Sequence, residues 1–385
     1  MFRFECSVIL SIYLMAFQLL SFINKLHTCR CFVLDYPLND QTLLTLLGED
    51  FYFPHEIIGQ ACKVSDFDGL KVSSFSTSDN VNLCYWEAGA GRPLIFIPGW
   101  SANGAMYFHL MHILSKHYHV YVLDVRNQGL SQRVKFGNRI SRYAQDVKEL
   151  ADHLELDEAD YCGWSMGASV MWAFIDLFGT TGIRTLSIID QAPSIYCHAD
   201  WTEQERLESG AFTTSPERMI ASYVNMSPTN TLISASRVVE RAMALDSPYF
   251  HNVISLVQSV VEDDMAFTGL VLFDHATNDW RDVIQSKIDV PTAIFTGDYS
   301  DWLESQHWMN AVINDSVLHV YSKADQGDHF LAFKNPLKFA SDLHAFLGTL
   351  ALCFLRRLIL TFDQPAFLSG RCSSFLPFWL SKMFR

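Results

Sequence analysis

The chain has 385 residues, of which 49% are hydrophobic and 18% charged, and it carries a formal net charge of −14. This composition excludes a disordered chain, a coiled coil and a collagen-like repeat. The acidic balance argues against a nucleic-acid-binding protein, because the phosphate backbone favours basic surfaces. We therefore expect a globular chain with a large core.

The N-terminal extension, residues 1–68, contains an uncharged stretch over residues 6–24 with an apolar centre. Its length just reaches that of a membrane-spanning helix, and the same features fit a secretory signal. These features favour a membrane-anchored or secretory location over a cytoplasmic one. A helix that packs on the body of the protein is the alternative.

The body begins with two apolar runs, Gly69–Phe75 and Val81–Trp86, which predict an antiparallel hairpin at the edge of a sheet. Strand-like and helical patterns then alternate up to about residue 194. The strand-like runs are Pro93–Pro98, His119–Leu123, Ala159–Cys162 and Thr185–Ile189, and the helical runs are Ser141–Leu156 and Ala168–Phe178. This alternation predicts βαβ units, and therefore a mostly parallel central sheet flanked by helices.

Residues 195–286 interrupt the alternation, because this stretch is polar and helical without clear strands. We expect a helical lid (cap) there, inserted after the sixth strand. The alternation returns over residues 287–349, with strand-like Thr292–Thr296 and Val317–Tyr321 and a closing helix at Leu337–Leu347. The predicted α/β core therefore consists of residues 69–194 and 287–349.

The C-terminal tail, residues 350–385, combines apolar runs with basic residues. Such a tail suits an anionic membrane surface, but Pro365, Gly370 and Pro377 interrupt any long helix. We expect a poorly ordered appendage. Membrane contact through residues 351–385 or through residues 6–24 is the alternative.

The segment Gly163-Trp164-Ser165-Met166-Gly167 has the form G-x-S-x-G. A predicted strand enters it and a predicted helix leaves it, as a nucleophile elbow requires. Gly163 and Gly167 would leave room for a serine held in a strained turn. We expect Ser165 to be a nucleophile, and a tight turn with an ordinary serine is the alternative.

A serine hydroxyl is a poor nucleophile near neutral pH, so it needs a base that an acid orients. Behind such an elbow the chain order is serine, acid, histidine. His329 lies between the last predicted strand and the last predicted helix, so it is the expected base. The expected acid is Asp301, in the loop after Thr292–Thr296. Asp298 in the same loop is the rival, and Asp190, after an earlier strand, is a third candidate.

An oxyanion hole needs two preorganised N–H donors. The backbone N–H of Met166, which follows the serine at a helix N-terminus, is one expected donor. The backbone N–H of Trp100 is the other, because Gly99 directly after the strand Pro93–Pro98 allows a close backbone approach.

Together these motifs resemble the α/β-hydrolase superfamily over roughly residues 69–349. The resemblance rests on Ile97–Trp100 (IPGW), Leu123–Ser131 (LDVRNQGLS), Gly163–Gly167 (GWSMG), Gly297–Asp301 (GDYSD) and Gly327–Phe330 (GDHF). The run GWSMGASVMW, followed by Asp190–Pro193 (DQAP), is similar to the branch of small-molecule esterases and cofactor-free, non-haem haloperoxidases.

The resemblance implies an α/β-hydrolase fold and a set of site residues. These are the triad Ser165, Asp301 and His329 and the oxyanion-hole residues Trp100 and Met166. It also implies that Asp124 and Arg126 shape the loop beside the site. Pro98 and Asn127 stand where the family usually has histidine and glycine.

We therefore expect a serine hydrolase that cleaves an ester or thioester of a small apolar molecule through an acyl-enzyme, with no cofactor and no metal. His109 and His112 have a metal-like spacing, but no third ligand accompanies them, and a surface helix is the preferred interpretation. One alternative is perhydrolysis, haloperoxidase-like, acyl-transfer or lyase chemistry by the same triad in small-metabolite biosynthesis. Another is a non-catalytic, ligand-binding member of the fold.

Overall fold

The computed structural model describes residues 36–48, 50–52, 61–211 and 269–348, together with 247, 249–250, 256–257, 260 and 267. The chain divides into two units, Met1–Ala340 and Ser341–Arg385, and in the second unit the described residues 341–348 are helical. The apolar segment 6–24 and the tail 350–385 lie outside the described residues, so their membrane contact stays a prediction. Nowhere in the described ranges is a helix both long and apolar enough to cross a membrane.

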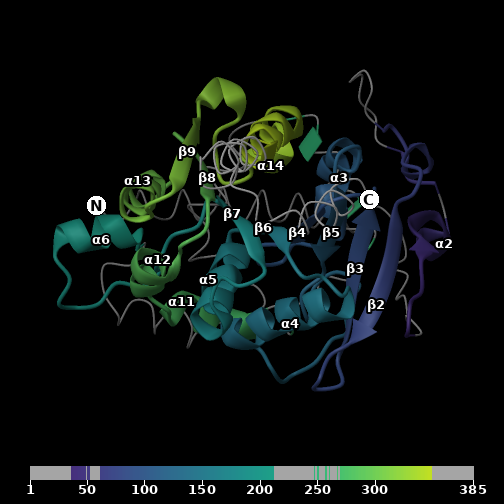
Figure 1. The fold of residues 1–385 in the computed structure, drawn as a ribbon, viewed down its shortest axis with the longest axis horizontal. Helices are drawn as coiled ribbons and strands as arrows, with labels where there is room; N and C mark the ends of the chain where they lie inside the picture. Colours follow the sequence, from purple (N-terminus) through teal and green to yellow (C-terminus); the bar gives the residue numbers. More distant parts are fainter. Residues whose placement is uncertain are drawn as a thin grey trace, which may run out of the picture. The chain divides into compact units, whose positions relative to one another are not determined.

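The described residues of the first unit contain nine strands that form one sheet of order β1-β2-β3-β5-β4-β6-β7-β8-β9 (Figure 1). The strands are β1 (Gln41–Thr42), β2 (Lys71–Ser76), β3 (Asn82–Ala88), β4 (Pro93–Ile97), β5 (His119–Leu123), β6 (Ala159–Trp164), β7 (Ile183–Ile189), β8 (Thr292–Gly297) and β9 (Ser316–Tyr321). β2 and β3 form the expected antiparallel hairpin, and the sheet is parallel from β5 to β9. The predicted mostly parallel sheet is confirmed.

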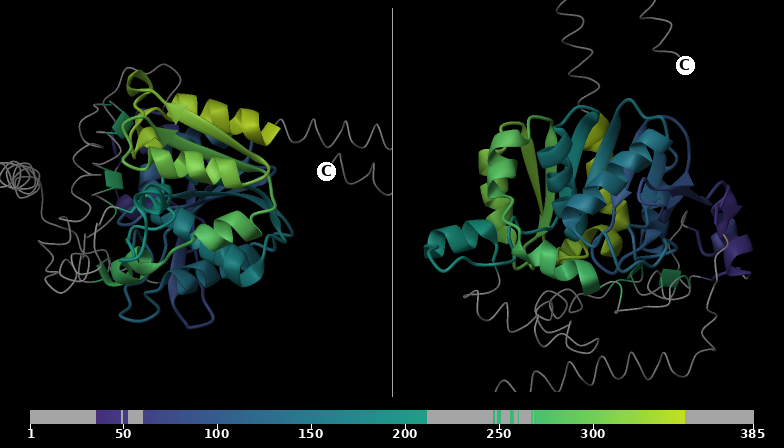
Figure 2. Two further views of the ribbon diagram at one scale, coloured as in Figure 1. Left: turned by 90° about the vertical axis from the view of Figure 1, so that its left-hand side faces the viewer. Right: turned by 90° about the horizontal axis from the view of Figure 1, so that it is seen from below.

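Helices cover both faces of this sheet. One layer contains α4 (Ile140–His153), α5 (Met166–Phe178), α12 (Arg281–Lys287) and α13 (Leu303–Val312), each of which contacts the next. The other face carries α3 (Phe108–Leu114), α14 (Leu331–Lys334) and the helical residues 336–340. In the left view of Figure 2, β8 and β9 lie between α13 and this last helix.

Shorter elements complete the described part of the chain. They are α2 (Leu43–Leu47), α6 (Glu203–Ser209), α11 (Leu272–Thr277) and the 3-10 turns Val64–Asp66, Gly104–Tyr107, Gly269–Val271 and Lys323–Asp325. The sequence patterns showed α4 and α5 but left α13 as a gap between two strands.

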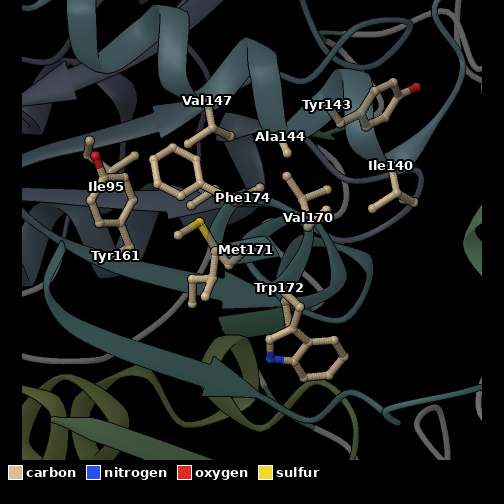
Figure 3. Packing of buried hydrophobic residues seen from close by; sticks show 14 of the residues in the cluster. Ile95, Ile140, Tyr143, Ala144, Val147, Tyr161, Val170, Met171, Trp172 and Phe174 are labelled. Atoms are coloured by element: carbon tan, nitrogen blue, oxygen red, sulfur yellow. The ribbon is translucent and has the colours of Figure 1, made fainter. Parts of the chain in front are cut away.

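The main core lies between the sheet and the α4–α5 layer (Figure 3). Val147 of α4 and Phe174 of α5 belong to one buried cluster with Ile95 of β4 and Tyr161 of β6. Phe96, between two core-facing isoleucines, packs instead against the ring of Tyr107, 5.2 Å away between centroids. This alternation of facing along β4 is the period of two that a strand imposes, and both faces are apolar because both are covered.

The described residues of the expected lid region, 195–286, are helical at α6, α11 and α12. Trp280, Val283 and Ile284 belong to the same buried cluster as α5, so this end of the segment is part of the core. Most of residues 212–268 lie outside the described residues. A cap over the site therefore stays a prediction for that stretch.

Candidate active site

Parallel strands bring three chemistry-bearing residues to one edge of the sheet. β6 ends directly before Ser165, β7 ends directly before Asp190, and the loop after β9 carries His329. β6 and β7 stay paired up to Trp164 and Ile189, so Ser165 and Asp190 leave the sheet side by side. The carboxyl ends of parallel strands are where sheets of this kind bind their ligands.

Ser165 sits in a strained turn between β6 and α5. Its φ is 53° and its ψ is −127°, a backbone conformation that residues other than glycine rarely adopt. The backbone N–H of Ser165 donates to the carbonyl of Ile189, 2.9 Å away, which fixes the turn to β7. A Cβ on Gly163 would lie 2.6 Å from the carbonyl oxygen of Gly167, and a Cβ on Gly167 would lie 2.0 Å from that of Ile97. Close backbone approach therefore requires glycine at both positions.

His329 lies between Ser165 and a buried carboxylate. Its Nε2 is 3.1 Å from Ser165 Oγ, and its Nδ1 is 2.7 Å from Asp190 Oδ2. An ionised carboxylate can only accept, so Nδ1 carries the hydrogen and donates to Asp190. Nε2 then presents its lone pair to the hydroxyl, and in this arrangement an imidazole can take the proton of a serine.

Asp190 is held rigidly at the end of β7. It is fully buried, its φ is 43°, and its N–H donates to the carbonyl of Phe295 at 2.9 Å. Its Oδ1 accepts a hydrogen bond of 2.6 Å from Thr296 Oγ1 on β8. Each carboxylate oxygen therefore has its own partner, and the plane of the carboxylate is fixed toward His329.

The prediction that Asp301 orients His329 is wrong, because Asp190 occupies Nδ1. Asp301 and its rival Asp298 are both exposed in the loop after β8. The N–H of Asp298 donates to the carbonyl of Tyr321 at the end of β9, 2.9 Å away. What this loop brings to His329 is the ring of Trp302, edge-on at 5.1 Å between centroids.

Asp190 had a signal in the sequence, but the acid was expected after the later strand Thr292–Thr296. Asp190 follows a predicted strand without any intervening residue, and that strand comes next in the chain after the one that ends in the elbow. In a parallel sheet two such strands are often neighbours, which places their carboxyl ends together.

The loop after β4 passes directly beside the nucleophile. A Cβ on Gly99 would lie 2.9 Å from Ser165 Cβ, so close approach requires glycine there. Trp100 follows and is half-buried, and Met166 is the first residue of α5. These are the two residues whose backbone N–H groups were expected to form an oxyanion hole, and the α5 N-terminus favours negative charge.

Side chains of the turn after β5 hold the loop after β4 in place through hydrogen bonds to its backbone. Asp124 accepts a hydrogen bond of 2.6 Å from the N–H of Gly104, and Gln128 Oε1 accepts one of 3.0 Å from the N–H of Ala102. Burial raises the pKa of Asp124 to about 6, even though three N–H donors lower it. Asp124 therefore has the role that the family resemblance implied, and Gln128 is a support that the sequence analysis missed.

Arg126 acts further from the site than the resemblance implied. Its buried guanidinium pairs with Asp146 of α4 at 2.6 Å and with Asp79 of the β2–β3 hairpin at 3.0 Å. It therefore fixes the turn to the neighbouring elements. Asn127, in the usual place of a glycine, has a φ of 67°, a left-handed conformation that asparagine tolerates better than most residues.

Aromatic rings surround the imidazole of His329. The rings of Trp164, Trp302 and Phe330 lie 5.3, 5.1 and 5.4 Å from it between centroids. Trp164 Nε1 also donates to the carbonyl of His329 at 2.9 Å. Phe250, from the inserted region, lies 4.9 Å from the ring of Phe330. The described surroundings of the base are thus largely apolar.

The described residues contain no group of three or more His, Cys, Asp and Glu side chains arranged to hold a metal ion. His109 is not on a surface helix as expected. It is buried on α3, and its ring contacts those of Phe108 and Tyr249 at 5.6 and 5.3 Å.

Comparison with known proteins adds evidence for the family. Residues 92–211 match the family model described as alpha/beta hydrolase fold. A non-heme chloroperoxidase from Kitasatospora aureofaciens is 29% identical over 126 residues, which are 32% of this chain and 46% of that protein. A pimeloyl-(acyl-carrier protein) methyl ester esterase from Aliivibrio fischeri is 24% identical over 276 residues, or 69% of this chain and 97% of that protein.

The chloroperoxidase is matched over 46% of its length, and two further relatives are matched over 35% and 44% of theirs. The chain therefore covers less than half of each of these three proteins. Among solved structures, an esterase from Exiguobacterium antarcticum has a TM-score of 0.59 at 18% identity, covering 71% of this chain and 98% of that one. This likeness shows the fold. The family model, the solved structures and the sheet show that the chain has the α/β-hydrolase fold, and its sequence is similar to esterases and non-haem haloperoxidases of that fold.

Proposed function

We propose that the protein is a serine hydrolase that cleaves an ester or thioester of a small, apolar molecule. The observation that carries this proposal is the hydrogen-bonded line from Ser165 Oγ to His329 Nε2 (3.1 Å) and from His329 Nδ1 to Asp190 Oδ2 (2.7 Å). A nucleophile, a base with the correct tautomer and a fixed acid are the three parts that acyl transfer needs.

In this mechanism His329 takes the Ser165 proton while Oγ attacks the carbonyl carbon. The oxyanion of the tetrahedral intermediate is stabilised by the backbone N–H groups of Trp100 and Met166. His329 then gives its proton to the leaving alcohol or thiol, and an acyl ester remains on Ser165. Water, deprotonated by His329, releases the acid, while Asp190 stabilises the imidazolium at both steps.

The apolar surroundings of the base support an apolar substrate. Trp164, Trp302 and Phe330 border His329, and Phe250 extends the same surface toward the inserted region. The relative from Aliivibrio fischeri is named as a methyl ester esterase, which supports an ester as the bond that is cleaved. We propose that the predicted cap over 195–286 selects the substrate.

The first experiment is labelling of the purified protein with a fluorophosphonate probe, which reacts with activated serines. We expect labelling of the wild type, located at Ser165 by peptide mapping, and none for Ser165→Ala. Ser286→Ala, which removes an exposed serine of α12, is the control and should label like the wild type. If the folded wild type does not react, the proposal fails and a ligand-binding role is favoured.

A second candidate activity is perhydrolysis, in which the acyl-enzyme is attacked by hydrogen peroxide and a peracid is released. Similarity to proteins named as non-heme chloroperoxidase and non-heme haloperoxidase favours it. The test supplies 4-nitrophenyl acetate with increasing hydrogen peroxide and measures acetate and peracetate. Peracetate that exceeds acetate at millimolar peroxide would make perhydrolysis the better description, and acetate alone would exclude it.

A further inference from the structure

A buried ion pair lies immediately beside the base. Asp328, the residue before His329, pairs through Oδ2 with Lys334 Nζ of α14 at 2.6 Å, and both side chains are fully buried. The other carboxylate oxygen of Asp328 accepts a hydrogen bond of 2.8 Å from the N–H of Phe330. The Asp328 carboxylate therefore connects the backbone of Phe330, the residue after His329, to α14.

Lys334 of this pair also contacts the inserted region. Lys334 Nζ lies 5.2 Å from the ring centroid of Phe250, and the carbonyl of Lys334 accepts a hydrogen bond of 2.6 Å from Ser247 Oγ. Phe250 in turn packs on Phe330, 4.9 Å away between centroids. Ser247 and Phe250 therefore contact Lys334, and Phe250 also contacts Phe330, the residue after His329.

Stability alone is a poor reason for such a pair. Removing two charges from water costs about as much as their attraction returns, and apolar residues of the same volume often stabilise a core better. Burial raises the pKa of Asp328, and the neighbouring Lys334 counteracts this by favouring the carboxylate. What the pair does supply is direction, because a short, charged hydrogen bond fixes two groups in one geometry.

We infer that Lys334 is a positioning residue for the base. By holding Asp328, it fixes the imidazole of His329 between Ser165 and Asp190, and it makes that position depend on the contact of Ser247 and Phe250 with α14. This inference rests on the proposed function, because it concerns the same triad. The inserted region would then act on the chemical step as well as on substrate selection.

The test compares Lys334→Met with Lys334→Arg in the full-length chain, using 4-nitrophenyl butyrate and the rate of fluorophosphonate labelling. A base displaced by about 1 Å costs up to about 100-fold in rate, so we expect Lys334→Met to lower kcat about 10- to 100-fold with KM changed less than about threefold. Lys334→Arg keeps the charge and the donor, and should recover most of kcat. A rise in KM at constant kcat would overturn the inference.

Lys334→Met leaves an unpaired carboxylate and can fail to fold, so a second variant removes both charges. The double variant Asp328→Asn with Lys334→Met should fold and melt near the wild type, because no buried charge remains. We expect its kcat to stay low. A folded double variant with wild-type kcat would show that the pair is only structural and would overturn the inference.

Two further variants complete the experiment. Lys287→Met breaks a 2.6 Å lysine–aspartate pair between α12 and α5 that is about half-exposed, and it should leave kcat and the labelling rate unchanged. Phe250→Ala should also lower kcat. An unchanged kcat in this variant would show that the position of the base does not depend on the inserted region. Failure of the proposed function is separate, because it would appear as a wild type that does not label.

Discussion

Two buried aspartates lie at opposite edges of the parallel sheet, and each accepts a hydrogen bond from a threonine. Asp160 lies at the beginning of β6, where its Oδ1 accepts a hydrogen bond of 2.7 Å from Thr185 Oγ1. Asp190 lies just past the end of β7, where its Oδ1 accepts one of 2.6 Å from Thr296 Oγ1. In each case a threonine of the neighbouring strand fixes one carboxylate oxygen.

The two carboxylates differ in their second partner, which is a guanidinium for Asp160 and an imidazole for Asp190. Arg92 Nε donates to Asp160 Oδ2 at 2.9 Å, and Arg184 also pairs with this carboxylate. A guanidinium keeps its charge and cannot pass on a proton. Asp190 instead faces the imidazole of His329, a side chain that can accept a proton and pass it on. Under the proposed function, the same type of side chain therefore joins strands at one end of the sheet and serves acid–base chemistry at the other.

The largest expected effect comes from Asp190→Asn. The amide can present a donor to Nδ1, which turns the imidazole into the tautomer that cannot accept the Ser165 proton. For a triad of this type the loss in kcat is about 10⁴-fold. Ester hydrolysis with 4-nitrophenyl butyrate measures it, and thermal melting should show a folded protein. A variant that keeps more than a tenth of wild-type kcat would show that Asp190 is not the acid.

Asp160→Asn should have the opposite effect, lowering the free energy of unfolding while leaving kcat unchanged. Breaking a buried pair is costly, but Arg92 and Arg184 are 32% and 18% exposed and can regain water, so we expect a loss of about 2 kcal/mol in the free energy of unfolding. Urea denaturation measures this loss. The kcat of the folded variant should match the wild type, and a tenfold fall in kcat would contradict the division of roles between the two ends.

A matched pair of smaller changes sharpens the comparison. Thr296→Val and Thr185→Val each remove one hydroxyl that donates to a buried carboxylate, while keeping the shape of the side chain. A hydrogen bond to a charged group contributes about 1.5–3 kcal/mol. We expect Thr296→Val to lower kcat about tenfold, since Asp190 then loses its fixed orientation. Thr185→Val should lower the free energy of unfolding by about 1–2 kcal/mol with kcat unchanged. Equal effects of both on kcat would count against the comparison.

Much of this fold could be predicted from the sequence because buried positions produce a clear local pattern of apolar residues. The run His119–Leu123 was predicted with the bounds that β5 has, since a parallel strand covered on both faces is continuously apolar. α13 was missed because Ser305 and Gln306 are among its buried residues, and buried polar side chains obscure the helical period.

The residues of the candidate site also fall into those with a local sequence signal and one without it. Ser165 and His329 could be predicted because each is marked locally, by the glycines of the elbow and by a position between the last strand and the last helix. The partner of His329 Nδ1 depends on which strand ends lie together, a property of the whole sheet. Asp301 and Asp190 each follow a strand, and only the packing of the β8 loop, which presents Trp302 to the imidazole, separates them.

The smallest expected effect is that of Asp301→Asn, which tests this separation directly. Asp301 is exposed, and Asp190 already occupies His329 Nδ1, so the substitution should change kcat and KM by less than about twofold. Asp298→Asn, in the same exposed loop, is the matched control and should behave identically. If Asp301→Asn instead lowered kcat by 100-fold or more while Asp190→Asn left it intact, the acid would come from the β8 loop during turnover. Asp190 would then hold the imidazole only at rest, as Asp160 holds its arginines.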